Sequence, residues 1–321
     1  MKPAPGHLAL RKAIEKNTNL ILVLAMGVGL MAPWVDKIPR WVILALLCLN
    51  MFFSCAKITV DNIKSIRGPT IGWFVFLRYL VLPVILFLTI EPVDFGIATA
   101  ALLLTLAPSG LTAPAITGLV KGNVAFSILI TIVTHLAFPL TAPIYLYVFV
   151  GRHIPIDTLS LFINLLAMVV LPALLFGLIR WRKPGAVAVA QIYATPISVL
   201  LIAMVIVVFF GQMRQYLFAN PQLALYDFVW VSLFYTSYVL VGGWWLGWRQ
   251  PGEIRIAMAS ASGTNNIALV LVVAILYLPP NVQLLVISAE IVWILSIPVF
   301  RKFIASQQKL ISLPEGKSSA G

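Results

Sequence analysis

Two short stretches inside long apolar runs carry the residues that could bind a ligand. One is residues 260–266, Ser-Ala-Ser-Gly-Thr-Asn-Asn, and the other is residues 107–114, Ala-Pro-Ser-Gly-Leu-Thr-Ala-Pro. Proline removes helical hydrogen bonds and glycine weakens a helix, so each stretch is expected to interrupt a helix and leave backbone groups unpaired. Freed N–H groups attract anions, and freed carbonyls coordinate Na⁺ or accept hydrogen bonds. A pair of such breaks can therefore bind a charged solute and an ion together.

The side chains at the two breaks are hydroxyls and amides. Proline kinks in membrane helices are often structural, and an asparagine can simply join two helices with a hydrogen bond worth about 1 kcal/mol. Two adjacent asparagines inside an apolar helix are harder to explain in that way. We therefore expect a binding site whose members are Ser109, Gly110, Thr112, Ser262, Gly263, Thr264, Asn265 and Asn266.

Glu290, Arg78 and His135 are ionisable residues that lie well inside the apolar runs. Glu290 is expected to be a cation ligand, a proton carrier or the partner of Arg78, because an unpaired carboxylate at that depth is costly. Arg78 could instead extend toward the lipid headgroups. His135 could titrate during a transport cycle, although a lone histidine of this kind more often hydrogen-bonds between helices.

The composition identifies the elements that must hold these residues. Of the 321 residues, 61% are hydrophobic and 10% are charged, against about 45–50% and 25% in globular chains. The mean hydropathy is +1.02. These values exclude a soluble protein and a disordered one, and they predict an all-α polytopic membrane protein.

The apolar runs are long enough for ten membrane-spanning helices, since about 20 apolar residues cross the hydrocarbon core. Only Lys121 and Gly122 interrupt the run from 94 to 150, so we place a turn there. The expected spans are 19–36, 41–60, 70–91, 94–120, 122–150, 159–179, 187–211, 224–248, 254–277 and 282–304.

The basic residues support this span count. Seventeen of the 22 lysines and arginines fall on the side of the N-terminus, four fall on the other side, and Arg78 lies within a span. The positive-inside rule then predicts that both termini are cytoplasmic. We expect the protein to lie in a bacterial inner membrane. The net charge of +12 is anchoring charge that faces lipid headgroups, and no nucleic-acid partner is expected.

An odd number of spans in each half predicts an inverted repeat of five and five helices. The expected domains are a cytoplasmic N-terminus (1–18), a first repeat (19–150), a second repeat (159–304) and a cytoplasmic tail (305–321). The two breaks then fall in spans 4 and 9, each the fourth span of its half. Inverted repeats with paired broken helices that cross near the midplane are typical of secondary transporters.

The residues around both breaks resemble those of the bile acid:sodium symporter family. The first break and the turn that follows it read Pro108-Ser109-Gly110 through Lys121-Gly122-Asn123, and the second reads Gly263-Thr264-Asn265-Asn266. The resemblance covers nearly the whole chain. It implies a core of spans 3–5 and 8–10 that moves against a panel of spans 1, 2, 6 and 7.

The resemblance also implies sodium as a coupling ion and no other cofactor. The positions that match are Ser127 and Thr131, with Thr264 and Asn265, but Ala113-Pro114 and Ala261 stand where the family has a Ser-Asn pair and an acidic residue. Without a carboxylate, a Na⁺ site of neutral oxygens binds more weakly. Arsenite exporters of the same topology use a cysteine in the fourth helix, and the only cysteines here are Cys48 and Cys55.

We therefore expect a sodium-coupled secondary transporter that carries an organic anion, bile-acid-like or smaller, by alternating access. The alternative is a proton-coupled or uncoupled carrier that uses Glu290. A channel would need polarity along its whole length, and an intramembrane enzyme would need a nucleophile with a base, or a metal cluster; neither pattern is present in the sequence.

Overall fold

Apolar runs of this length form helices, because a helix satisfies its backbone hydrogen bonds without water. A computed structural model describes residues 5–56, 68–239 and 244–311. All regular secondary structure in these residues is helical, apart from one isolated β-bridge. Residues 1–4, the basic loop with Lys57, Lys64 and Arg67, residues 240–243 of the expected eighth span and the tail end at 312–321 lie outside them.

The helices of the N-terminal part begin and end close to the bounds expected from the apolar runs. Asp94 and Asn123 accept the N–H groups of Ile97 and Phe126 and so cap α6 and α8. The order is α1 (Pro5–Lys16), α2 (Thr18–Met31), the 3₁₀ turn η1 (Pro33–Lys37), α3 (Arg40–Cys55), α4 (Gly68–Val75), the π-helical segment η3 (Phe76–Val81), α5 (Leu82–Ile90), α6 (Phe95–Leu106), α7 (Ala113–Leu119), α8 (Val124–Tyr145) and the π-helical segment η4 (Leu146–Val150).

The turn predicted at Lys121 and Gly122 is present between α7 and α8. Lys121 has a left-handed φ of 57° there. The following helices are α9 (Thr158–Arg182), α10 (Pro184–Ala219), α11 (Pro221–Val239), α12 (Gly252–Gly263), α13 (Ile267–Tyr277) and α14 (Pro280–Ile311).

Several helices are long and apolar enough to cross a bilayer. Within the described residues four stretches qualify individually: Gly68–Ile90, Val124–Val150, Thr158–Arg182 and Pro184–Ala219. A fifth is obtained if Leu10–Lys16 and Leu20–Met31, which are bent by 77°, form one span. Large apolar side chains such as Leu136, Leu140 and Ile144 of α8 are exposed at successive turns, as expected for a lipid-facing surface. The chain is a polytopic, all-helical membrane protein.

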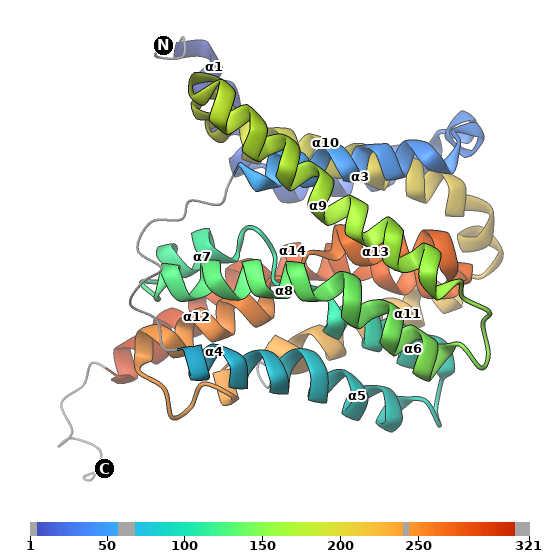
Figure 1. Ribbon diagram of the computed structural model, residues 1–321. Helices are drawn as coiled ribbons and strands as arrows, with labels where there is room; N and C mark the ends of the chain where they lie inside the picture. The colour runs from blue at the N-terminus through green and yellow to red at the C-terminus, as the bar shows by residue number, and fades with distance from the viewer. Residues whose placement is uncertain (1–4, 57–67, 240–243, 312–321) are drawn as a thin grey trace, which may run out of the picture.

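The helices pack in two groups. One group contains α2, α3, α9 and α10, with α10 packed against both α2 and α3, and Figure 1 shows α3, α9 and α10 together in the upper layer. The other group contains α4 to α8 and α11 to α14 and lies below it. Within the second group, α6 and α13 are buried along most of their length, so the residues that follow α6 and precede α13 lie in the interior.

Two pairs of helices are separated by short breaks at the segments where the sequence predicts interruption. Residues 107–112 separate α6 from α7, and residues 264–266 separate α12 from α13. Figure 1 shows α7 and α12 on one side of the molecule and α6 and α13 on the other, so the two broken pairs run in opposite directions.

Candidate functional site

The two breaks contact each other through their backbones. Ser109 and Asn265 form an antiparallel β-bridge. The N–H of Gly110 donates to the carbonyl of Thr264 at 2.5 Å, and the N–H of Asn266 donates to the carbonyl of Pro108 at 2.8 Å. Backbone groups that lose their helical partners are therefore satisfied by the opposite break rather than by lipid or water. We call this contact, formed by residues 107–112 and 264–266, the crossing.

Gly110 allows the two backbones to approach. A Cβ atom at this position would lie 3.2 Å from the carbonyl oxygen of Thr264 and 3.3 Å from that of Asn265. Both atoms belong to the backbone and cannot move aside without shifting the break. The glycine is thus required by the close approach, and Gly110 contributes its N–H rather than a side chain to the site.

Arg78 reaches the crossing from a neighbouring helix and is 0% exposed. Its Nε donates to Oγ of Ser262 at 3.1 Å, and its Nη2 donates to Oδ1 of Asn265 at 2.8 Å and to the carbonyl of Ser262 at 3.3 Å. Its Nη1 donates to the carbonyl of Thr105. The guanidinium also lies over the ring of Tyr79, 3.9 Å from its centroid. One side chain therefore bonds to oxygens on both broken helix pairs.

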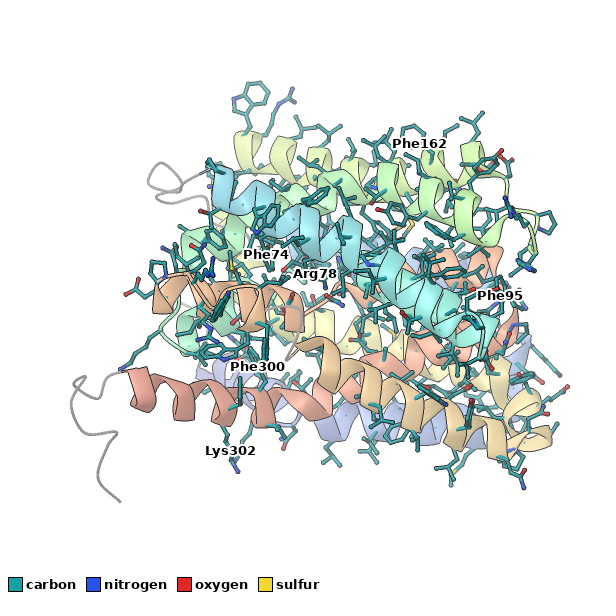
Figure 2. All side chains as sticks on the ribbon, turned by 90° about the horizontal axis from the view of Figure 1, so that it is seen from below. Phe74, Arg78, Phe95, Phe162, Phe300 and Lys302 are labelled. Atoms are coloured by element: carbon teal, nitrogen blue, oxygen red, sulfur yellow. The ribbon has the colours of Figure 1, made fainter. Side chains whose placement is uncertain are left out.

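The local helix geometry places Arg78 there. Arg78 belongs to the π-helical segment η3, between α4 and α5. π-Helical turns inside α-helices are frequent at functional sites. Figure 2 shows the Arg78 side chain beneath this helix, near the end of α12. Within the described residues no ion pair joins Arg78 to Glu290, and full burial excludes the extension toward headgroups that the sequence left open.

The two adjacent asparagines have different partners. Asn265 is 5% exposed, and its Nδ2 donates to the carbonyl of Leu104 at 2.9 Å. The Nδ2 of Asn266, which is half-buried, contacts Nε2 of His135 at 2.9 Å and Sδ of Met51 at 3.4 Å. Asn265 thus bonds to Leu104 and Arg78 within the crossing, whereas Asn266 contacts α3 and α8.

The hydrogen bonds fix the tautomer of His135. Its Nδ1 lies 2.8 Å from the carbonyl of Thr131, which can only accept, so Nδ1 carries the hydrogen. Nε2 is then in position to accept a hydrogen bond from the amide of Asn266. His135 therefore hydrogen-bonds between helices, which was the commoner of the two roles considered from the sequence.

Hydroxyl groups of α8 face the first break. The N–H of Ser109 donates to Oγ1 of Thr134 at 3.1 Å, and Oγ1 of Thr131 approaches Oγ of Ser109 at 3.4 Å and the carbonyl of Ser127 at 2.9 Å. The buried Oγ atoms of Ser127 and Ser260 have no hydrogen-bond partner among the described residues. These buried oxygens form a polar cluster beside the first break.

The structure brings most of the predicted site residues together. Gly263 is the last residue of α12, and Oγ1 of Thr264 donates back to the carbonyl of Ser260 at 2.6 Å. Thr112 is half-buried and directly precedes α7, but its side chain does not cap that helix. The predicted residues gathered at the crossing or beside it are Ser109, Gly110, Thr112, Ser127, Thr131, Ser262, Gly263, Thr264, Asn265 and Asn266.

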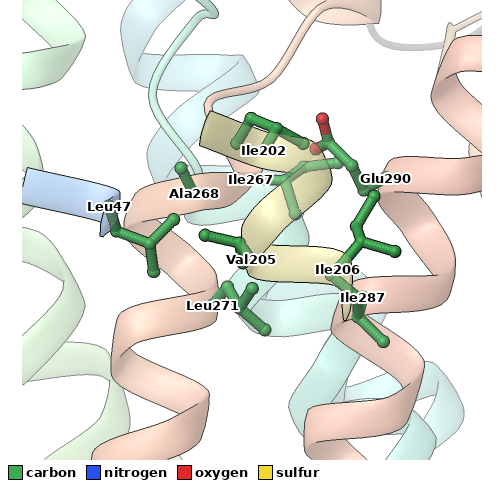
Figure 3. A pocket seen from close by; sticks show the side chains of 9 residues that line it. All are labelled: Leu47, Ile202, Val205, Ile206, Ile267, Ala268, Leu271, Ile287 and Glu290. Atoms are coloured by element: carbon green, nitrogen blue, oxygen red, sulfur yellow. The ribbon is translucent and has the colours of Figure 1, made fainter. Parts of the chain in front are cut away.

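Glu290 lies apart from this network. It lines a small pocket between the two helix groups, with side chains of α3 and α10 on one side and of α13 and α14 on the other, as Figure 3 shows. The other lining side chains are all aliphatic: Leu47, Ile202, Val205, Ile206, Ile267, Ala268, Leu271 and Ile287. The pocket reaches the first turn of α13 and therefore adjoins Asn266.

The sequence did not identify three of the contributors. The carbonyls of Leu104 and Thr105 belong to the end of α6, and no side-chain type signals such a role. Thr134 extends the pattern of Ser127 and Thr131 along one face of α8, and that spacing could have indicated it. Arg78 was recognised as unusual, but its partners are distant in the sequence.

The chemistry available at the crossing is that of hydrogen bonding and fixed charge. The residues supply amide and hydroxyl groups, backbone carbonyls and one guanidinium. Within the described part of the chain, no group of three or more His, Cys, Asp or Glu side chains is placed to hold a metal ion. Such an arrangement can bind a solute through hydrogen bonds and charge.

Comparison with known proteins agrees with these features. The model of the sodium bile acid symporter family matches residues 44–220. The uncharacterized sodium-dependent transporter YocS of Bacillus subtilis (strain 168) is 28% identical over 152 residues, which are 43% of this chain and 45% of that protein. The probable chloroplastic sodium/metabolite cotransporter BASS1 of Oryza sativa subsp. japonica is 26% identical over 158 residues, 48% of this chain and 38% of that protein.

The matched segments thus span less than half the length of each of these two relatives. The family match covers more than half of the chain, from within α3 to the end of α10, and includes the first break. Its members are transporters rather than enzymes, and they act on small molecules at a lipid bilayer. The chain belongs to the sodium bile acid symporter family.

Proposed function

We propose that the protein is a secondary transporter that carries a small organic anion, bile-acid-like or smaller, by alternating access. The observation that carries the proposal is the crossing: two interrupted helix pairs meet in the protein interior and present amides, hydroxyls and unwound backbone there. Broken helices that meet in this way form the solute sites of many secondary transporters. The printed names of both relatives, a sodium-dependent transporter and a sodium/metabolite cotransporter, agree with this function.

The proposed cargo site extends from the crossing into the pocket between the two helix groups. Asn266 supports this position, because its half-buried amide lies between α3 of one group and α8 of the other. The small pocket beside it is lined almost entirely by aliphatic side chains, and a displacement of the helix groups would have to widen it before the hydrocarbon part of an organic anion could enter. The hydroxyls and amides at the crossing would take its polar end.

The proposed movement is a displacement of one helix group against the other. In this proposal α2, α3, α9 and α10 form the panel, and α4 to α8 with α11 to α14 form the core, in ten spans arranged as an inverted repeat of five and five. The packing supports it, because helices pack more extensively within each group than between the groups. A cargo bound between the groups would then be exposed to each side in turn.

The proposed orientation has both termini in the cytoplasm of a bacterial cell, with the protein in the inner membrane. The excess of lysine and arginine in alternate loops supports this orientation. For the coupling ion, the names of the family and of both relatives favour sodium. A proton is the alternative, because Glu290 is the one ionisable side chain that lines the pocket.

Uptake into proteoliposomes tests the proposal. The purified protein is reconstituted and offered bile acids and short mono- and dicarboxylates under imposed sodium or proton gradients. We expect saturable uptake of at least one class, and loss of that uptake in Asn265→Ala plus Asn266→Ala. Asn164→Ala is the matched control, because Asn164 bonds Tyr277 between helices at 2.9 Å away from the crossing. Full activity in the double variant would refute the site, and no uptake of any class would refute the cargo.

A further inference from the structure

We propose that Arg78 is a tethered cation that holds the two breaks together, so that this chain needs no sodium ion at the crossing. The inference deepens the proposed function and rests on it for its transport consequences alone. It follows from the ligands of the guanidinium, from the direction of the helices that end there and from the residues available to a free ion.

The guanidinium is surrounded by the kind of oxygens that a hard cation takes as ligands. Its partners include two backbone carbonyls, of Thr105 and Ser262, the hydroxyl of Ser262 and the amide oxygen of Asn265. Carbonyl, hydroxyl and amide oxygens are ligands of Na⁺ at helix breaks in membrane transporters. The side chain of Arg78 thus fills, with five N–H donors, a position that is chemically suited to an ion.

The two helix ends that Arg78 contacts are carboxyl ends. Thr105 lies in the last turn of α6, and Ser262 lies in the last turn of α12. Each helix carries the equivalent of about −0.5 elementary charge at its carboxyl end, so two such ends together match about one positive charge. Arg78 supplies that charge in a fully buried position where water does not screen it.

A sodium ion at the crossing would have to compete with the guanidinium. Residues 104–112 and 260–266 contain no aspartate or glutamate, so an added ion would find neutral oxygens only. Asn265, one of the expected sodium ligands, already gives its amide oxygen to Arg78. The hydroxyls of Ser127 and Ser260 remain, but a second positive charge beside a buried guanidinium is repelled, and neutral hydroxyls do not offset this. The crossing is therefore complete without sodium.

Removal of Arg78 should create a requirement for an ion. Arg78→Gln leaves the two helix ends and their carbonyls without a cation, so Na⁺ gains a site. Arg78→Lys keeps the charge and should not create that requirement. Arg255→Gln is the matched control, because Arg255 also donates to a backbone carbonyl, that of Trp244 at 2.9 Å, but lies at the start of α12.

The test measures thermal unfolding of the purified full chain in NaCl and in choline chloride of equal concentration. We expect equal midpoints in the two salts for the unsubstituted chain, Arg78→Lys and Arg255→Gln. For Arg78→Gln we expect a lower midpoint in choline chloride and a saturable increase with NaCl. A saturable sodium-specific increase in the unsubstituted chain would overturn the proposal, as would a folded Arg78→Gln that does not respond to sodium.

If Arg78→Gln is not recovered as a folded protein, the unfolding midpoints of the unsubstituted chain and of Arg78→Lys still test the proposal. A sodium-specific increase in either contradicts the proposal, and equal midpoints in both support it. Where a cargo has been found, this proposal selects the sodium-independent alternative of the proposed function: uptake should change less than about twofold when choline replaces sodium. Uptake by Arg78→Gln should fall about tenfold or more and recover with NaCl. Failure to find any cargo would refute the proposed function without altering the outcome of the unfolding test.

Discussion

Ser109 and Asn265 form the one β-bridge among the described residues, and they come from two different broken helix pairs. The hydrogen bonds on either side of this bridge join Gly110 to Thr264 and Asn266 to Pro108. Two helices that could each have been merely kinked are thus joined to each other at their breaks. Stability and solute binding are both expected to depend on this contact.

Gly110→Ala should destabilise the protein. The added methyl group would lie 3.2 Å from the carbonyl oxygen of Thr264, and separating the two backbones costs about 1–3 kcal/mol. Thermal unfolding in detergent measures the loss. Gly177→Ala is the control, because a Cβ at that position in α9 meets no atom within 4 Å. The control should be as stable as the unsubstituted chain or slightly more stable, since alanine favours a helix. Equal stability of Gly110→Ala and Gly177→Ala would contradict the close approach.

His135→Phe should also destabilise the protein, by removing the acceptor for the amide of Asn266. Loss of this hydrogen bond from the half-buried amide costs about 0.5–1.5 kcal/mol. His135→Gln retains an acceptor and should recover part of the loss, in both unfolding midpoint and uptake. If phenylalanine and glutamine have the same effect, the hydrogen bond to Asn266 does not contribute.

Glu290→Gln should change how uptake depends on pH, if the carboxyl group exchanges a proton as cargo moves through the pocket. The unsubstituted chain should then show an uptake that varies with external pH, and the glutamine variant should show a flatter profile at a lower rate. Asp36→Asn, an exposed carboxylate in η1, is the control. An unchanged rate and profile in Glu290→Gln would remove this residue from the coupling scheme.

Asp157 should stabilise α9 in a pH-dependent manner. It caps the helix outside the membrane-spanning segments, and the hydrogen bonds from Oγ and N–H of Ser160 hold the pKa of its carboxyl group below the usual range. A lowered folded-state pKa means that the contribution is present above the unfolded-state pKa and is lost as pH falls through the folded-state pKa. Asp157→Ala should therefore lower the unfolding midpoint at neutral pH and differ less from the unsubstituted chain under strongly acidic conditions. A difference that is independent of pH would contradict the charged cap.

The positions of the helices were predictable from the sequence because lipid imposes a length and a polarity on each run. The turn at Lys121 and the interruptions at Pro108 and Gly263 have local causes, a charge, a proline and a glycine, and each is visible in the sequence. What joins the two interruptions is not local. No pattern within either stretch indicates that the carbonyl of Pro108 accepts from Asn266.

The role of Arg78 shows the same limit more clearly. An arginine inside an apolar run costs free energy unless it is paired, and the sequence suggested Glu290 or the lipid headgroups as its partners. The fold brings Thr105, Ser262 and Asn265 to it as partners, and two of these contacts are made by backbone carbonyls that no residue type reveals. Glu290, which the sequence offered as a cation ligand, a proton carrier or the partner of Arg78, lines the apolar pocket between the helix groups.

Disulfide formation between residues 109 and 265 tests the crossing most directly. Ser109→Cys and Asn265→Cys are introduced together in a chain with Cys48→Ala and Cys55→Ala. In an antiparallel pair whose flanking residues make the hydrogen bonds, the Cα atoms lie about 4.5 Å apart, which is within the range of a disulfide. The account predicts that an intramolecular cross-link forms in the folded protein on mild oxidation. Two thiols that both label after denaturation but never cross-link in the folded protein would contradict it.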